Sequence, residues 1–232
     1  MFVPLHDINP LRRIRAPVVT YTLIAACTVI FVLFQSVDAE YAALGFGVIP
    51  AEFRLGALPT IAAIPEPLTF ITYTFVHGGW MHLIGNMLFL WVFGDNVEDA
   101  MGHGRFLGFY MVAGSAGALA HAASAPYSGV PLVGASGAIA GVVAAYVILH
   151  PCVKVWVLLL ARLPLKISAM WAIAGWVVFQ IGGVLLDTER DTAWWAHIGG
   201  FAAGALLIPV MRRPGVPLFD RPAVETILRR EP

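Results

Sequence analysis

The sequence predicts an all-α membrane protein, a bundle of six transmembrane helices with both termini in the cytoplasm. Of its 232 residues, 59% are apolar and only 12% are charged, whereas soluble domains carry about 25% charged residues. The mean hydropathy is +0.80. Apolar runs of membrane-spanning length recur along the chain, and Lys and Arg gather on alternate connections between them. The net charge is zero, which gives no sign of a nucleic-acid partner.

Six apolar runs make up the predicted spans. They cover residues 17–34, 81–93, 106–123, 133–150, 167–186 and 193–211. The run at 106–123 is rich in Gly and Ala, which favours close helix packing. A basic segment precedes the first run, but no small-x-small cleavage site follows it, so we interpret it as a span and not as a removable signal.

The connections divide the chain into three parts. Residues 38–74 are apolar but broken by prolines, which predicts short helical pieces lying in the membrane interface. The apolar run at 153–161 is too short to cross and is also expected to be interfacial. No fold is assigned to the tail. The expected organisation is therefore a cytoplasmic segment (1–16), a membrane domain (17–213) and a cytoplasmic tail (214–232).

The positive charges set the predicted orientation. Only Arg54 and Arg190 fall on the outer connections, and the inner side takes Arg12, Arg13, Arg15, Arg105, Lys154, Arg162, Lys166, Arg212 and Arg213. The positive-inside bias therefore predicts cytoplasmic termini. A short N-terminus without a transit-like stretch favours a bacterial plasma membrane over a mitochondrion.

One small-residue motif carries a hydroxyl at the head of the fourth span, Gly134-Ala135-Ser136-Gly137. Ser136 could be a nucleophile that Gly134 and Gly137 leave uncrowded, or a small residue that lets helices pack closely. In the predicted orientation the second, fourth and sixth spans all enter from outside. Ser136, His197, His82 and Asn86 then lie within roughly 10 Å of the outer interface. Polar groups at one depth inside a membrane are candidates for function.

The chemistry of these four residues suits acyl transfer. A serine hydroxyl needs a base to take its proton, and His197 shares the depth of Ser136. No carboxylate lies near that depth, so we expect a Ser-His dyad whose histidine is oriented by packing. His82 and Asn86 stand one helical turn apart on the same face, and with the Ser136 backbone N–H they could donate to an oxyanion. Asn86 could also serve as an interhelical contact.

The same residues also fit other classes of protein, which the sequence disfavours. The intramembrane histidines could belong to a transporter or metal permease, but the chain lacks an HExxH motif and internal repeats. Ala138 breaks the G-x-S-x-G pattern of an α/β-hydrolase. We therefore expect no metal and no cofactor.

In these motifs the chain resembles the rhomboid intramembrane serine proteases. The resemblance covers roughly residues 17–213 and rests on Gly134-Ala135-Ser136-Gly137, His82-Leu83-Ile84-Gly85-Asn86, Ala196-His197-Ile198-Gly199-Gly200 with Gly204, His77, and Glu52-Phe53-Arg54. It implies a six-helix bundle with a water-filled cavity open to the outside. It further implies that the protein cleaves transmembrane substrates within the lipid bilayer.

The resemblance also implies roles for single residues. Ser136 would be the nucleophile and His197 the general base and acid. His82, Asn86 and the Ser136 backbone would form the oxyanion hole.

In the same resemblance, Gly200 and Gly204 would let the sixth span approach the fourth, and His77 matches a further family histidine. The fifth span and the connection at 187–191 would gate lateral substrate access. Ala140 stands where some members have a tyrosine stacked on the histidine, which leaves the orientation of His197 open. The alternative function is a non-proteolytic relative that binds membrane helices.

Overall fold

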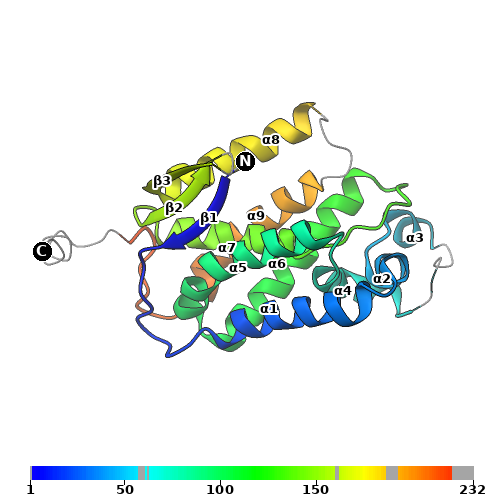
Figure 1. Cartoon of the computed structure of the whole chain (residues 1–232), viewed down its shortest axis with the longest axis horizontal. Helices are drawn as coiled ribbons and strands as arrows, with labels where there is room; N and C mark the ends of the chain where they lie inside the picture. Colours follow the sequence, from blue (N-terminus) through cyan, green and yellow to red (C-terminus); the bar gives the residue numbers. More distant parts are fainter. Residues whose placement is uncertain (1, 57–60, 62, 160–161, 187–192, 221–232) are drawn as a thin grey trace, which may run out of the picture.

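A computed structural model of the chain describes residues 2–56, 61, 63–159, 162–186 and 193–220. Most of this part of the chain is helical, and a small sheet lies at one side of the helices (Figure 1). The long helices are α1 (Val18–Ile30), α5 (Trp80–Met101), α6 (His103–Ser124), α7 (Ser136–Leu149), α8 (Ala169–Leu186) and α9 (Trp194–Met211). A π-helical turn, η1 (Phe31–Gln35), continues α1.

Four helical stretches in the described residues are long and apolar enough to cross a membrane: Val18–Gln35, α6, α8 and α9. They confirm the helices predicted at 17–34, 106–123, 167–186 and 193–211. The other two predicted spans are also helical. However, α7 has only 14 residues, and the 22-residue α5 carries Asp95, Glu98 and Asp99. The count of six spans therefore stays a prediction.

Helix α7 is the centre of the bundle. It packs against α5, α6 and α9, and its residues from Gly137 to Tyr146 are all buried. Its small residues, such as Ala144 and Ala145, let these neighbours come close. The residue that begins α7, Ser136, is therefore surrounded by helices contributed by distant parts of the sequence.

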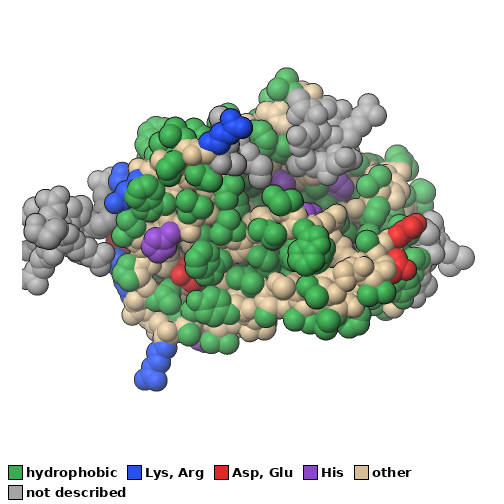
Figure 2. Space-filling model, in the orientation of Figure 1, with side chains coloured by type: hydrophobic (Ala, Val, Ile, Leu, Met, Phe, Trp, Pro, Cys, Tyr) green, Lys and Arg blue, Asp and Glu red, His purple; other side chains and the backbone are tan. Residues whose placement is uncertain are grey.

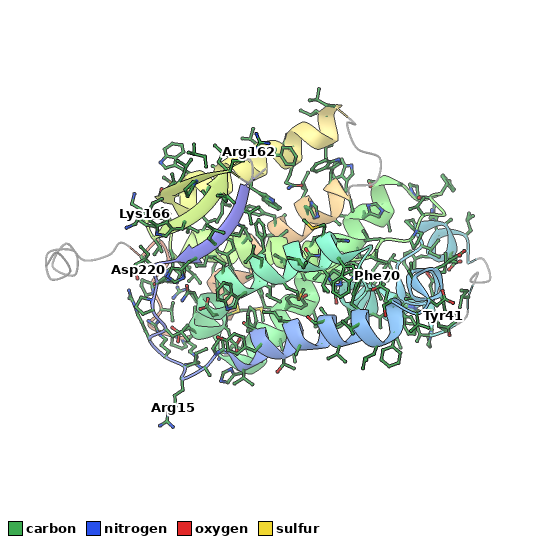
Figure 3. The ribbon with its side chains drawn as sticks, viewed as in Figure 1. Arg15, Tyr41, Phe70, Arg162, Lys166 and Asp220 are labelled. Atoms are coloured by element: carbon green, nitrogen blue, oxygen red, sulfur yellow. The ribbon has the colours of Figure 1, made fainter. Side chains whose placement is uncertain are left out.

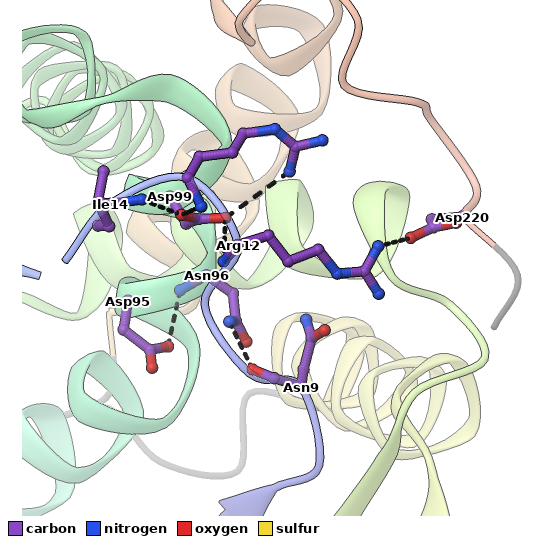
Figure 4. A network of polar contacts seen from close by, with 8 residues as sticks. Asn9, Arg12, Ile14, Asp95, Asn96, Asp99 and Asp220 are labelled. Atoms are coloured by element: carbon purple, nitrogen blue, oxygen red, sulfur yellow. Dashed lines mark hydrogen bonds and ion pairs between the residues drawn. The ribbon is translucent and has the colours of Figure 1, made fainter. Parts of the chain in front are cut away.

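The prediction that the second span ends at residue 93 is wrong, because α5 continues to Met101. Its last turns carry polar groups that the N-terminal segment satisfies (Figure 4). The Asp99 carboxylate accepts hydrogen bonds from the backbone N–H groups of Arg13 and Ile14, at 2.6 and 2.7 Å. Asn96 Nδ2 donates to the carbonyl oxygen of Asn9 at 2.9 Å. Charged residues usually end a membrane helix, but here they are bonded and buried, so the helix continues.

Within the run at 153–161, for which no strand was predicted, Lys154–Leu159 forms the strand β2. Val155 and Val157 are buried while Lys154 and Trp156 are exposed. This alternation is the period of a strand. Strand β2 pairs in antiparallel fashion with β1 (Phe2–Asp7) and with β3 (Leu163–Ser168), in the order β1-β2-β3. The all-α class is corrected accordingly to a mostly helical fold with a small sheet.

Both ends of the chain, as far as they are described, pack against the helices. The N-terminal segment supplies β1, which packs beside α5. The tail, to which no fold was assigned, lies against the end of α7 as far as it is described. The N–H groups of Phe219 and Asp220 donate to the carbonyls of Ile148 and Leu149 at 2.7 and 2.8 Å. Residues 221–232 lie outside the described part.

At the opposite end, the first connection forms short helices, as predicted. These are α2 (Ala39–Phe46), α3 (Pro50–Leu55) and α4 (Glu66–Thr72), followed by the turn η2 (Tyr73–Phe75). An isolated bridge joins Val48 to Leu132, with N–H···O distances of 3.0 and 2.8 Å. This bridge holds the first connection against the segment that leads into Ser136.

The surface matches a protein in contact with lipid. Figure 2 shows hydrophobic side chains over most of the visible face. In Figure 3, Arg15 and Lys166 lie toward the end that carries the sheet, and Tyr41 lies toward the other end. At the sheet end, the N–H of Arg213 donates to the carbonyl of Ala100 at 2.8 Å. Basic residues from different connections are thus gathered at one end of the bundle.

Candidate active site

Ser136 and His197 meet at the start of two helices. Ser136 is the first residue of α7, and His197 lies in the first turn of α9. The distance from Ser136 Oγ to His197 Nε2 is 2.9 Å, which is a hydrogen bond. The two residues are 61 positions apart in sequence, so the packing of α7 on α9 alone creates this pair.

Glycines allow that packing. A Cβ atom added to Gly200 would lie 2.8 Å from the carbonyl carbon of Gly137. One added to Gly204, a turn later, would overlap the backbone of Gly141. Even alanine has no room at these two positions of α9. The two helices therefore touch backbone to backbone, as small residues permit in membrane bundles.

The second ring nitrogen of His197 also has a partner. His197 Nδ1 lies 2.8 Å from Oε1 of Gln180, a residue of α8 that is 4% exposed. With the amide oxygen as acceptor, Nδ1 carries the proton and Nε2 is left to accept from the Ser136 hydroxyl. Sequence reasoning missed Gln180 and assigned the orientation of His197 to packing. The signal was present, because a glutamine in the middle of an apolar span is a candidate for function.

Two tryptophans enclose the His197 ring. The ring centroid of Trp176 on α8 lies 6.0 Å away, and that of Trp194 on α9 lies 6.4 Å away at an interplanar angle of 90°. Ala140, where a stacking tyrosine was considered, is 1% exposed and leaves no space for an aromatic ring. The aromatic contacts of His197 thus come from α8 and α9, while α7 supplies Ser136.

His82 and Asn86 converge on Gly134, two residues before Ser136. His82 Nδ1 accepts a hydrogen bond from the N–H of Gly78 at 3.2 Å, so the proton of the neutral ring sits on Nε2. A Cβ added to Gly134 would lie 2.6 Å from His82 Nε2 and 3.6 Å from Asn86 Nδ2. Both donors therefore point toward the backbone two residues before Ser136.

Asn86 Nδ2 is buried and has no hydrogen-bond partner among the described residues. A buried N–H group without an acceptor is costly, and such groups occur at functional sites. Gly134 has a φ of +118°, which L side chains rarely adopt. Its N–H donates to the carbonyl of Tyr73 at 2.9 Å. Glycine is thus required at 134 both by the backbone conformation and by the approach of His82.

His77 is buried beside His82. It is 0% exposed, and its ring meets that of His82 edge-on at 5.4 Å. Its backbone N–H donates to Oε1 of Gln35 at 2.9 Å, and its carbonyl accepts from the same side chain. His77 therefore supports the position of His82.

Two further expectations concern a metal site and the connection at 187–191. Among the described residues, no group of three His, Cys, Asp or Glu side chains is placed to hold a metal ion. The proposed gating connection at 187–191 lies outside the described part of the chain.

Comparison with known proteins identifies the family. A family model, the Rhomboid domain, matches residues 65–214. The chain is similar to the Rhomboid protease GluP of Bacillus subtilis, 29% identical over 158 residues, which are 68% of this chain and 29% of that protein. It is also similar to the mitochondrial Rhomboid protein 1 of Saccharomyces cerevisiae, 33% identical over 148 residues, 62% of this chain and 41% of that protein.

A third relative is the chloroplastic Rhomboid-like protein 11 of Arabidopsis thaliana, 32% identical over 151 residues, 62% of this chain and 52% of that protein. The matches span about half or less of the length of these relatives. The fold and the apolar helices define an integral membrane protein in which a serine and a histidine are hydrogen-bonded to each other inside the helical bundle. This chain belongs to the rhomboid family.

Proposed function

We propose that this protein is an intramembrane serine protease that cleaves other membrane proteins in or near their transmembrane segments. The observation that carries the proposal is the 2.9 Å hydrogen bond between Ser136 Oγ and His197 Nε2. Two donors, on His82 and Asn86, converge on Gly134, two residues before Ser136. A nucleophile, a base and donors for an oxyanion are the parts that acyl transfer requires.

In the acylation step, His197 Nε2 takes the hydroxyl proton as Ser136 Oγ attacks the carbonyl carbon of the substrate peptide. The negative charge that forms on the carbonyl oxygen accepts hydrogen bonds from His82, Asn86 and the Ser136 N–H. The N–H at the start of α7 also lies at the positive end of the helix dipole. His197 then gives its proton to the leaving amine, the C–N bond breaks, and an acyl-enzyme remains.

Deacylation repeats these steps with water. His197 removes a proton from water, the resulting hydroxide adds to the ester carbon, and the same donors hold the oxyanion. When the ester bond breaks, Ser136 Oγ recovers the proton from His197 and the new carboxyl end of the substrate is released. No metal ion or cofactor takes part in this sequence of steps.

The bilayer restricts which peptide bonds are substrates. A transmembrane helix has all of its backbone groups hydrogen-bonded internally, so the scissile carbonyl becomes accessible only when the helix unwinds. Substrates should therefore contain helix-destabilising Gly or Pro near the cut, and a small residue at the cut itself. Lateral access would pass α8 and the connection at 187–191.

The length of α7 supports a site below the membrane surface. Fourteen residues span about 21 Å, less than the ~30 Å thickness of the hydrocarbon core. With its C-terminal end at the cytoplasmic side, α7 would begin inside the outer leaflet. This placement belongs to the proposal, together with the six spans, the cytoplasmic termini and a bacterial plasma membrane.

Labelling with a fluorophosphonate probe tests the proposal in purified, detergent-solubilised protein. We expect the wild type to be labelled, and Ser136→Ala and His197→Ala to lose labelling. Ser115→Ala is the matched control, because this half-buried hydroxyl of α6 donates to the Phe70 carbonyl at 3.3 Å; it should be labelled like the wild type. Absence of labelling in a folded wild-type protein would reject the protease and favour the non-proteolytic helix-binding alternative.

A cleavage assay extends the test to the reaction itself. A model membrane protein with a Gly-rich transmembrane segment should be cut by the wild type in liposomes, and by neither Ser136→Ala nor His197→Ala. Full cleavage by Ser136→Ala would contradict the proposed nucleophile.

A further inference from the structure

Gln180 differs from the rest of α8. Only 28% of the apolar window of α8 is buried, and its buried positions are otherwise the small or apolar residues Ala169, Ala172, Ile173 and Gly183. Gln180 is 4% exposed and uses its amide oxygen on His197 Nδ1 at 2.8 Å. Burying an amide at membrane depth is unfavourable unless it is bonded, so this position is paired with His197 specifically.

We propose that Gln180 is the positioning residue of the catalytic histidine. His197 is then held in the orientation of a general base only while α8 is packed against α9. The inference rests on the proposed protease function. Gln180 would hold the Nδ1–H tautomer of His197, with Nε2 directed at the Ser136 hydroxyl. When α8 separates from α9, His197 loses this acceptor and its orientation.

The choice of an amide has chemical consequences. In a Ser-His-Asp triad a carboxylate bonds Nδ1–H, orients the ring and stabilises the imidazolium that forms during attack. The neutral oxygen of Gln180 can orient the ring but offers no full negative charge. A carboxylate at position 180 would therefore keep the orientation and make His197 a stronger base. Substitutions at position 180 can therefore separate the orientation of the His197 ring from the electrostatic stabilisation of the imidazolium.

Helix α8 also packs closely against α9 next to Gln180. A Cβ added to Gly183, three residues after Gln180, would lie 2.6 Å from Cζ2 of Trp194. The backbone of α8 thus rests directly on the Trp194 ring, and that ring meets His197 at 90°. Trp176, one turn before Gln180, also lies near the histidine, with ring centroids 6.0 Å apart. One face of α8 therefore provides both the acceptor and an aromatic wall for His197.

Other titratable groups near His197 must be considered in a pH experiment. Among the described residues, these are His82 from α5 and His121 from α6. The partners from the remaining packed elements, Ser136, Gln180 and the two tryptophans, carry no charge near neutral pH. A His121→Gln background therefore separates the titration of His121 from that of His197.

The test measures the rate of fluorophosphonate labelling against pH for the wild type, Gln180→Leu and Gln180→Glu. The probe is small and needs no lateral access, so it reports on the Ser-His pair and not on substrate passage. We expect Gln180→Leu to slow labelling on the order of 10²-fold, as misplacement of a catalytic group does. Gln180→Glu should restore most of the rate and move the acidic limb of the profile to higher pH.

The matched control is Gln35→Leu. Gln35 is the other buried glutamine of the described chain, and it bonds the backbone of His77 instead of a ring nitrogen. Whatever it does to the yield of folded protein, its pH midpoint should equal that of the wild type. Gly183→Ala tests whether the packing of α8 against α9 matters. It keeps the Gln180 amide but pushes α8 away from Trp194, and it should slow labelling at least tenfold.

Each failure has a separate meaning. A wild type that is not labelled removes the proposed protease itself. A labelled wild type with Gln180→Leu at the same rate and midpoint overturns the role of Gln180. Equal slowing by Gln180→Leu and Gln180→Glu without a shift in midpoint reduces Gln180 to packing. Wild-type labelling by Gly183→Ala overturns the coupling to α8.

Discussion

Gly200 of α9 and Gly137 of α7 are in backbone contact: a Cβ atom on Gly200 would lie 2.8 Å from the carbonyl carbon of Gly137. Gly137 follows Ser136, and Gly200 comes one turn after His197. The approach of these two glycines therefore sets the distance between the serine and the histidine.

Gly200→Ala should separate α7 from α9 and break the Ser136–His197 hydrogen bond. Overpacking of this kind costs about 1–3 kcal/mol, so the melting temperature in detergent should fall and fluorophosphonate labelling should be lost. Gly108→Ala on α6 is the control, because a Cβ there meets no atom within 4 Å. Labelling of Gly200→Ala at the wild-type rate would show that the pair tolerates a wider spacing.

Asn86→Ala should remove one oxyanion donor while leaving the nucleophile and base in place. Loss of one such donor lowers kcat by about 10² to 10³-fold. Because the donor acts on the transition state, KM for a model transmembrane substrate should change little. Steady-state cleavage in liposomes gives both constants. A rise in KM with unchanged kcat would assign Asn86 to helix packing.

Glu98→Gln should destabilise the fold without touching the site. The Glu98 carboxylate is 0% exposed and accepts from the N–H groups of Val19 and Thr20, the hydroxyl of Thr20, and His103 Nδ1. Glutamine would turn an NH₂ group toward these donors, at a cost on the order of 2–4 kcal/mol. Thermal unfolding measures it. The exposed Glu40→Gln should unfold like the wild type, and equal stability of the two variants would contradict the prediction.

Asp7 should make stability depend on pH. Tyr146 Oη donates to Asp7 Oδ2 at 2.6 Å, yet burial dominates and raises the pKa of Asp7 to about 6 from 3.8. The folded state thus holds the Asp7 proton more tightly than the unfolded state does. The difference has no effect below pH 4, where both states are protonated. Stability then falls as pH rises from about 4 to about 6, by up to ~3 kcal/mol.

Asp7→Asn removes this titration, so the difference in unfolding free energy between variant and wild type should grow in favour of the variant from pH 4 to pH 6, and stay constant above. Denaturant unfolding in detergent at several pH values provides the measurement. A difference that is constant over this range would show that Asp7 ionises without cost in the folded protein.

Helices were predicted correctly from the sequence where a long apolar run is enough to identify them. Residues 17–34, 106–123, 167–186 and 193–211 were predicted as spans from hydropathy, and helices of spanning length occupy them with shifts of a few residues. The predictions were wrong where tertiary partners decide. The end of α5 was placed too early because the N–H groups that donate to its buried acids lie some 80 residues away, on the N-terminal segment.

The strand at Lys154–Leu159 escaped prediction for a similar reason. A six-residue apolar run is ambiguous between a strand and an interfacial segment. Its partners, β1 and β3, decide the case, and β1 comes from the far end of the chain. Gln180 was visible in the sequence as a polar residue inside a span, but nothing local tied it to His197.

By itself the sequence determined that this is a membrane protein and which long apolar stretches are helices, because hydropathy depends only on local composition. The shared depth of the polar residues stays a prediction. Tertiary structure alone decided that Ser136 and His197 lie at hydrogen-bonding distance, that Gln180 holds the second ring nitrogen, and that the N-terminal segment joins a sheet. These contacts join residues distant in sequence, and the Ser136–His197 pair forms because glycines let the backbones of α7 and α9 touch.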